Sequence, residues 1–170
     1  NKAKKNLNFI LANQNEDGSW LYAVNDKRDN FIDHFHTCFV LKNLYKVNCI
    51  LKDERITSGI KKGFEFYKNN LFDKAGFPIP FAKLSRFNIV KTELYDYAES
   101  ISLCIDVNDL DKDALQMKEK LIKNLINDYQ TKDGHFVTRV GIFNIRNKIP
   151  YLRWPQAQLF CTLTKCLING

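Results

Sequence analysis

The sequence predicts an all-α protein built from three tandem αα-hairpins that repeat every 58 residues. Gly18, Gly76 and Gly134 are equally spaced, and an aromatic residue follows each of them within two positions. An amphipathic segment precedes each of these turns, and a second helical segment follows each turn after a loop. At 170 residues the chain has the length of one domain with a substantial core.

The first helix of each predicted hairpin has apolar residues at i, i+3 and i+4 spacing. The glycine after it suits a helix end that needs positive φ, and the aromatic residue can fold back to seal the turn. The residues that form these patterns are Leu7, Ile10 and Leu11; Ile56, Ile60, Phe64, Tyr67 and Leu71; and Leu115, Leu121, Ile122, Leu125, Ile126 and Tyr129.

The second helices are predicted over residues 31–47, 93–107 and 155–168, which gives hairpins of about 1–50, 51–108 and 109–170. Pro155 suits a first helical position, and Asp109 or Asp111 can cap the fifth helix. The loops after the second and third turns are long. They contain Pro78, Pro80 and Pro150, so we expect ordered extended segments, including a short β-ribbon.

Hairpins of this length must stack on neighbours to bury their apolar faces. A solenoid would have short loops at both ends of its helices. Here one set of loops is long, which favours an α/α toroid whose loops gather at one rim of a central cavity. We therefore expect residues 1–170 to form a single helical repeat domain within a larger toroid.

Composition narrows the function classes. The net charge is +7, but the lysines are spread along the helices, which argues against nucleic acid binding and leaves an acidic sugar polymer as the better match. No apolar run reaches the roughly 18 residues of a membrane span. Five cysteines without metal-ligand spacing indicate reduced core cysteines and a cytoplasmic protein. The sequence starts at Asn1 without a visible signal peptide, which suggests a fragment or a processed chain.

The segment from Phe9 to Trp20 resembles the QW motif of the terpenoid-cyclase and prenyltransferase toroids. Only this unit matches the motif fully. The acidic DxDD motif of the cyclases is absent, since residues 109–113 do not match it, and the prenyltransferase zinc ligands are not found. This resemblance implies the toroid but not terpene chemistry.

A closer resemblance covers nearly the whole chain. Residues 15–20, 30–37, 97–99 and 153–157 are similar to bacterial proteins encoded among capsule and O-antigen genes, which are described as polysaccharide-biosynthesis proteins. Those proteins share the α/α toroid of six-hairpin glycosidases, epimerases and uronyl hydrolases. A complete toroid of this kind has about twice as many hairpins, so the chain resembles a C-terminal half.

In such toroids the second helix of each hairpin lines the cavity, so the resemblance places a site at the starts of these helices. Carboxylates there can act as general acid and base, while aromatic and arginine side chains bind sugars. We expect catalytic roles for Asp33, His36, Asp96 and Glu99, and substrate binding by His34, Tyr95, Arg153, Trp154 and Gln156.

Some of these residues have structural alternatives. Asp33 can complement the helix dipole, and His36 can be a hydrogen-bonded core histidine. Trp20 is expected to plug its turn. His34 and His36 point to different helix faces, so they form no joint metal site, and no nucleotide-binding motif is present. No metal or cofactor is expected.

The preferred functional hypothesis is a carbohydrate-active protein that binds a sugar polymer or a lipid-linked sugar at the rim, as a glycosidase, lyase or epimerase. The alternatives are a non-catalytic glycan-binding or scaffold module and an isoprenoid-handling toroid. Because a half toroid exposes apolar helix faces, we expect a homodimer or a missing N-terminal half.

Overall fold

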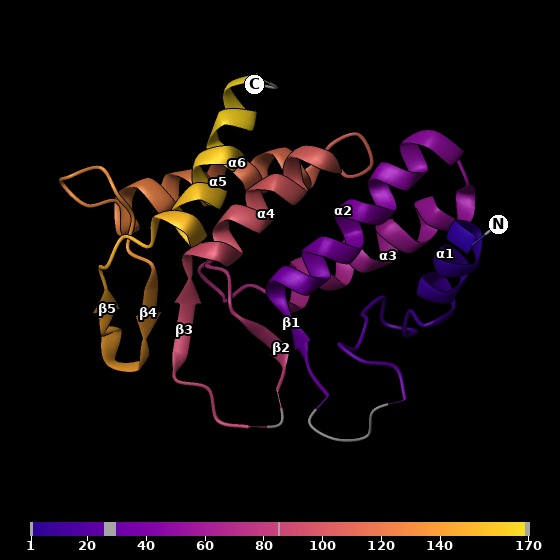
Figure 1. The fold of residues 1–170 in the computed structure, drawn as a ribbon, viewed down its shortest axis with the longest axis horizontal. Helices are drawn as coiled ribbons and strands as arrows, with labels where there is room; N and C mark the ends of the chain where they lie inside the picture. Colours follow the sequence, from indigo (N-terminus) through magenta and orange to yellow (C-terminus); the bar gives the residue numbers. More distant parts are fainter. Residues whose placement is uncertain (1, 26–29, 85, 169–170) are drawn as a thin grey trace.

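The computed structural model describes residues 2–25, 30–84 and 86–168. Within these ranges six α-helices dominate, and the all-α prediction is confirmed (Figure 1). The helices are α1 (Lys2–Ala12), α2 (His34–Leu51), α3 (Glu54–Asn70), α4 (Leu94–Asp106), α5 (Asp113–Tyr129) and α6 (Ala157–Ile168). The links between them contain the strands β1 (Ile32–Asp33), β2 (Phe81–Lys83), β3 (Val90–Glu93), β4 (Arg139–Gly141) and β5 (Arg146–Asn147), the 3-10 turn η1 (Ile142–Asn144) and the π-helical turn η2 (Leu152–Gln156).

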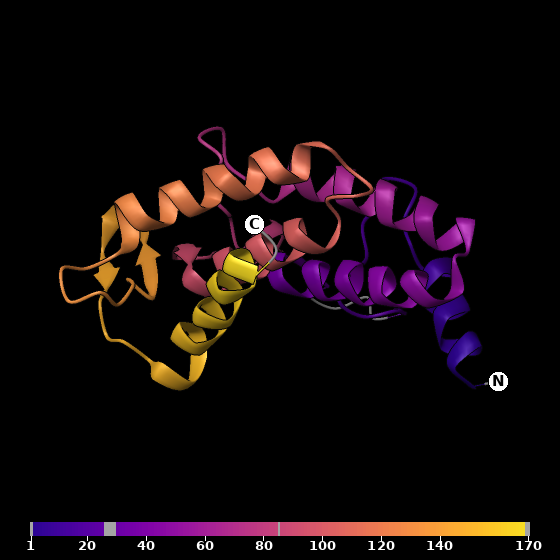
Figure 2. The same ribbon diagram turned by 90° about the horizontal axis from the view of Figure 1, so that it is seen from above.

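The helices form two layers (Figure 2). We call α2, α4 and α6 the inner helices and α1, α3 and α5 the outer helices. α4 packs against α2, α5 and α6, and α2 also packs against α3. Because neighbours surround α4, every residue from Leu94 to Cys104 is buried. A helix covered on all sides in this way forms the centre of the core.

Among helices that follow one another in the chain, α2 packs against α3 and α4 packs against α5. The links that join these pairs are short, covering residues 52–53 and 107–112. In these pairs an inner helix comes before an outer helix. In each predicted hairpin (1–50, 51–108 and 109–170) an outer helix comes before an inner helix. Either grouping describes the same alternation of outer and inner helices.

Three turns of the same geometry follow the outer helices. The glycine amide donates to the carbonyl of Asn15, Asp73 or Thr131, at 2.9–3.0 Å. The amide of that residue in turn donates to the carbonyl four positions on, at 2.7–2.9 Å. All three glycines have φ between +85° and +93°. This pattern is a tight turn that ends in a left-handed glycine, as in a three-residue hairpin loop.

The glycines therefore lie several residues beyond their helices and not at the helix ends that the sequence suggested. In the first unit the aromatic residue after the glycine seals the turn, as predicted. Trp20 is buried, and its indole Nε1 donates to the carbonyl of Ile10 at 2.9 Å. Gln14 Nε2 donates to the carbonyls of Gly18 and Gly59, both at 2.9 Å, which ties this turn to α3.

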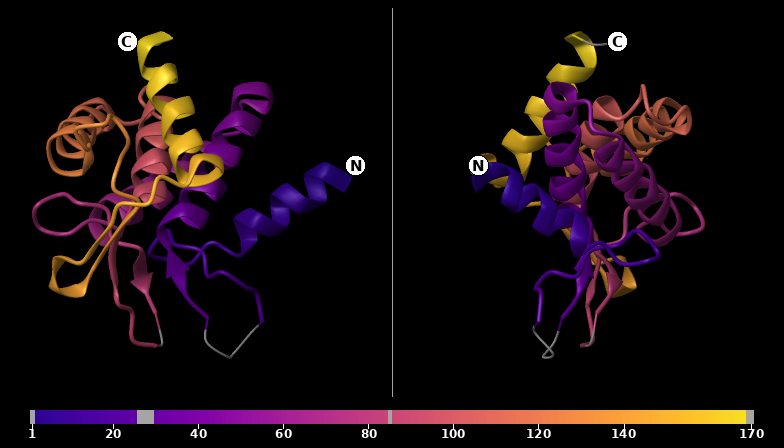
Figure 3. Two further views of the ribbon diagram at one scale, coloured as in Figure 1. Left: turned by 60° about the vertical axis from the view of Figure 1, so that its left-hand side comes forward. Right: turned by 90° about the vertical axis from the view of Figure 1, so that its right-hand side faces the viewer.

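The long links gather at one edge of the helices, as predicted (Figures 1 and 3). β1 pairs antiparallel with β2, which places Asp33 opposite Phe81. β3, β4 and β5 form a second antiparallel sheet. Both sheets lie beside the first residues of α2 and α4, and the expected short β-ribbon is present.

Some boundaries differ from the prediction. The second helices begin at residues 34, 94 and 157, because the residues before them belong to β1, β3 and η2. Pro155 lies in η2 after a cis peptide bond with Trp154, so it does not occupy the first position of α6. The Asp111 carboxylate accepts the Asp113 amide at 2.9 Å and so caps the start of α5.

The five cysteines are free, and only Cys38 and Cys104 are fully buried, while Cys49 and Cys161 are exposed. Among the described residues, no helix combines the length and apolarity that crossing a bilayer requires.

Candidate functional site

The inner helices present their first turns at the edge that carries the strands (Figure 1), and most of the predicted site residues belong to these turns or to the segments just before them. β1 leads into α2, β3 leads into α4, and η2 leads into α6. The short strands thus fix where each inner helix begins.

At the start of α2, Asp33 and His36 form a hydrogen-bonded pair. His36 Nδ1 lies 2.5 Å from Asp33 Oδ2. Asp33 is buried, and burial raises the pKa of its carboxyl group while the bond to His36 opposes that rise. The His36 side chain is 39% exposed. An imidazole held by a buried carboxylate on one nitrogen, with part of its ring exposed, has the arrangement of a general acid or base.

A small cavity of about 190 Å³ adjoins this pair. Tyr22 stacks on Phe31 with ring centroids 4.4 Å apart and meets the edge of His36 at 4.9 Å. Trp20 also lines the cavity. His36 is therefore surrounded by aromatic rings, and is not a core histidine.

His34 belongs to the core and not to the site. It is fully buried, with Nδ1 3.0 Å from the carbonyl of Ile79 and Nε2 2.7 Å from the hydroxyls of Tyr67 and Ser100. Burial lowers the pKa of His34 to about 3, so the ring is neutral and joins α2 to α3 and α4. This burial does not favour the predicted substrate-binding role of His34.

Asp96 lies in the first turn of α4 and is also buried, with 1% exposure. Neither carboxylate oxygen has a hydrogen-bond partner among the described residues. Burial, followed by the nearby charges of Glu93, Asp33 and Glu99, raises its pKa well above the usual range. Glu93 is paired with Arg139 at 2.7 Å across β3 and β4. Asp96 thus lies near Asp33, but as a proton-holding group below the surface.

Glu99, one turn further along α4, bridges the three inner helices. Its Oε2 lies 2.5 Å from Lys42 Nζ of α2, and its Oε1 accepts from Gln158 Nε2 of α6 at 3.3 Å. Both Glu99 oxygens are therefore engaged. This leaves the carboxylate poorly placed to act as a free nucleophile or base.

An aromatic row crosses the starts of the inner helices. Tyr95 contacts Phe35 of α2 at 5.3 Å and Trp154 of η2 at 4.8 Å between ring centroids. Phe39 extends the row at 6.3 Å from Tyr95. Trp154 is 45% exposed, so the row offers an accessible ring face. Burial raises the pKa of Tyr95, which keeps its hydroxyl protonated.

The remaining predicted residues have different environments. Arg153 is exposed in η2 beside the row. Gln156 exchanges two hydrogen bonds with the backbone of Phe136, accepting from its amide at 3.2 Å and donating to its carbonyl at 2.7 Å. Gln156 thus fixes η2 to the third turn and has a structural role.

Sequence reasoning missed a polar strip deeper along the inner helices. Lys42 Nζ and Lys165 Nζ lie 3.5 and 3.4 Å from Ser102 Oγ. Burial raises the pKa of Asp106, and the charges of Lys165 and Lys42 oppose that rise. The signal in the sequence was the helical spacing of Tyr95, Glu99, Ser102 and Asp106, which places them on one face of α4.

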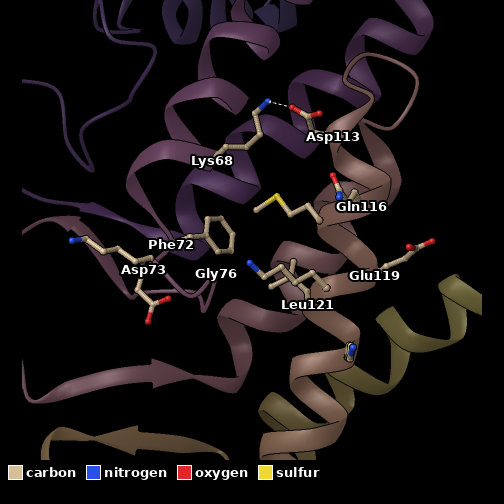
Figure 4. A pocket seen from close by; sticks show the side chains of 12 residues that line it. Lys68, Phe72, Asp73, Gly76, Asp113, Gln116, Glu119 and Leu121 are labelled. Atoms are coloured by element: carbon tan, nitrogen blue, oxygen red, sulfur yellow. Dashed lines mark hydrogen bonds and ion pairs between the residues drawn. The ribbon is translucent and has the colours of Figure 1, made fainter.

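A larger hollow lies elsewhere, on the outer layer between α3, the Gly76 turn and α5 (Figure 4). Its volume is about 720 Å³. Lys68 closes one end through ion pairs with Asp111 at 2.8 Å and Asp113 at 3.1 Å. Because this hollow contains none of the inner-helix residues, it is not the candidate site. Among the described residues, no group of three or more potential metal ligands is found.

Comparison with solved structures shows which fold this arrangement belongs to. The chain superposes over 96% of its length on cellobiose 2-epimerase from Spirochaeta thermophila, with a TM-score of 0.78 and 11% identity, and covers 46% of that chain. It also superposes over 79% of its length on a sugar epimerase from a ruminal bacterium, with a TM-score of 0.68, 16% identity and 37% of that chain covered. The fold is a partial α/α toroid.

An α-mannanase from Bacteroides thetaiotaomicron has the same toroid, with a TM-score of 0.62 and 13% identity over 81% of this chain and 40% of the mannanase. The chain thus spans less than half the length of each of these proteins. No protein-family profile and no curated protein matches the sequence. The partial toroid accounts for the two layers and for the convergence of the inner helices at one rim.

Proposed function

We propose that this chain forms one side of a carbohydrate-active α/α toroid and binds a sugar chain over the aromatic row of Phe35, Tyr95 and Trp154. The observation that carries the proposal is this row, whose Trp154 ring is exposed and whose Phe35 ring lies 4.2 Å from the ring of His36. Aromatic faces combine an apolar surface with neighbouring polar groups, as sugar rings require. The sugar-processing activities of the superposed proteins support the same class of ligand.

Within this proposal, His36 transfers a proton to or from the sugar while Asp33 orients its ring. A glycosidase needs two available carboxylates. Here Asp33 is bound to His36, Glu99 is bound to Lys42, and Asp96 is buried. Proton transfer of the kind that lyases and epimerases perform therefore suits the site better than glycoside hydrolysis.

Sugar binding can be tested by tryptophan fluorescence, since the chain has two tryptophans and Trp20 is buried. Titration with a panel of neutral and uronate oligosaccharides should change the emission of Trp154. Trp154→Ala should abolish the change and weaken binding by about tenfold or more, because a stacking face is lost. Phe143→Ala, on the exposed hairpin between β4 and β5, is the control. Binding that survives Trp154→Ala would contradict the placement of the sugar.

Catalysis is tested with His36→Gln. Using an oligosaccharide that binds, proton exchange at a sugar carbon is followed by nuclear magnetic resonance in deuterated water. We expect the variant to lose exchange and turnover at least about 100-fold while it keeps its affinity. His135→Gln, at the third turn, should behave as the unchanged protein. Equal turnover in His36→Gln would remove His36 from the reaction.

The binding and turnover experiments also distinguish two alternative functions. A non-catalytic glycan-binding module would bind the same oligosaccharides with no product after long incubation. An isoprenoid-handling toroid would bind apolar chains, but the polar strip of Lys42, Glu99 and Ser102 favours a sugar. Free cysteines are consistent with the cytoplasmic location proposed from the sequence.

A further inference from the structure

An apolar groove runs between α1 and α2, and no described helix covers it. Its volume is about 450 Å³. Apolar side chains form most of its lining, with Asn43 at its exposed edge. The larger apolar lining residues are Leu7, Ile10, Phe39, Val40, Leu44, Val47 and Leu51, and the polar ones are Lys4, Asn6 and Asn43. A largely apolar lining of this kind indicates a surface that another element covers.

The repeat shows what kind of element belongs in this groove. α2 packs against both α3 and α4, and α4 packs against both α5 and α6. Each of these inner helices therefore lies between the next outer helix and the next inner helix. α1 and α2 form the same kind of groove, so the missing element is an inner helix.

The chain also has an inner helix with an uncovered face. One side of α6 packs against α4. Elsewhere on this helix Phe160 is 73% exposed, and Leu167 and Ile168 are also exposed. The apolar face of α6 and the α1–α2 groove are thus two open, complementary surfaces on one molecule.

We propose that α6 of a second copy of this chain occupies the α1–α2 groove, and that two copies close a complete toroid. A contact between two different faces of the same molecule forms a ring when its rotation closes. The chain covers 46% of a toroid on which it superposes, so two copies supply nearly the whole length.

Closure would also complete the aromatic row. Within one copy the row runs from Phe35 through Tyr95 to Trp154. By the repeat, the next position beyond Trp154 is Phe35 of the second copy. The cavity would then carry two such rows, each continued across the contact between the copies.

The test measures the mass of the purified chain in solution by light scattering and sedimentation. Phe160→Asp places a charge on the exposed face of α6. Asn43→Arg places a long charged side chain across the groove without altering a buried residue. Phe143→Asp is the matched control, because Phe143 is 90% exposed, lies on neither face and has φ of 57°, which Asp tolerates.

We expect a dimer for the unchanged chain and for Phe143→Asp. Phe160→Asp and Asn43→Arg should each raise the dissociation constant by about 100-fold or more, with unchanged circular dichroism. An equal mixture of these two variants should recover a dimer, because one contact then joins an intact α6 to an intact groove. A mixture that stays monomeric would overturn the head-to-tail arrangement.

A monomeric unchanged chain would overturn the proposal and assign the groove to an inner helix of a longer polypeptide. Neither result depends on sugar binding. The ring and the proposed function can therefore fail separately.

Discussion

His34 shows that a polar residue at the start of an inner helix can serve the core. Its two ring nitrogens join α2 to the backbone of Ile79 and to the hydroxyls of Tyr67 and Ser100. The sequence could not separate His34 from His36, because both follow β1 within three residues. In the fold, His34 turns inward to Tyr67 and Ser100, whereas His36 turns to Asp33 and Tyr22.

Acid should destabilise the protein through His34. Its pKa is about 3 in the folded state and 6.5 in the unfolded chain, so the unfolded state binds the proton more tightly. The contribution to stability is complete above pH 6.5 and is lost as the pH falls from there toward 3.

His34→Gln should flatten this pH dependence and lower the free energy of unfolding at pH 7 by about 1–3 kcal/mol, through lost hydrogen bonds. Urea unfolding over a pH series measures both effects. His135→Gln, at the third turn, is the control and should keep the slope of the unchanged protein. If His34→Gln and the unchanged protein showed the same dependence of the free energy of unfolding on pH, His34 would not be the source of that dependence.

Asp96 should make stability depend on pH in the opposite direction to His34. Its folded pKa is raised above the unfolded value of 3.8, so its favourable contribution is complete below 3.8 and is lost as the pH rises through the folded value. Asp96→Asn removes this ionisation. The variant should therefore gain stability relative to the unchanged protein as the pH rises.

Thermal unfolding at increasing pH compares Asp96→Asn with Asp133→Asn, a matched change at an exposed turn position. A constant difference across the pH series would show that Asp96 is ionised in the folded protein. The family resemblance suggested Asp96 as a site residue, but its burial depends on the packing of α4 against α2, α5 and α6, which no local pattern reveals.

At the scale of the elements, the helices were largely predictable and the turns only in part. The apolar spacing located the three outer helices, because each buries one face, and the inner helices were placed in the segments after the loops. The equal spacing of Gly18, Gly76 and Gly134 located the turns. The separation between each glycine and its helix was missed, because it depends on hydrogen bonds across the turn.

The three glycines should differ in their tolerance of alanine. All have positive φ, which costs an alanine about 1–2 kcal/mol. At Gly134 an added Cβ meets nothing within 4 Å, so the cost of positive φ is the only one expected there. At Gly76 the Cβ would lie 2.5 Å from Lys120 Nζ, a flexible group that can move. At Gly18 it would lie 2.3 Å from the backbone carbonyl of Lys62.

The free energy of unfolding should therefore fall least for Gly134→Ala, more for Gly76→Ala and most for Gly18→Ala, where the loss exceeds the conformational cost by about 1–3 kcal/mol. Urea denaturation gives the three values. Equal losses would indicate that the first turn moves away from α3 without cost.

At the scale of the whole molecule, the one-sided loop lengths predicted the toroid correctly. Which consecutive helices pack together was not predictable, because outer and inner helices alternate along the chain in the same way whichever helix is counted first. The inner helices begin at the rim that carries the long links, and the site placed there stays a prediction. The polar strip was not predicted, because Lys42, Ser102 and Lys165 lie beyond the first turns of their helices.

The division of the links into a long set and a short set separates two kinds of evolutionary change. Insertions in the long links would remodel the rim while the helix contacts keep their register. An insertion in residues 52–53 would instead shift α3 along α2 and disturb the core. A duplicated scaffold of this design can diversify its specificity at one edge while the opposite edge preserves the spacing of the helices.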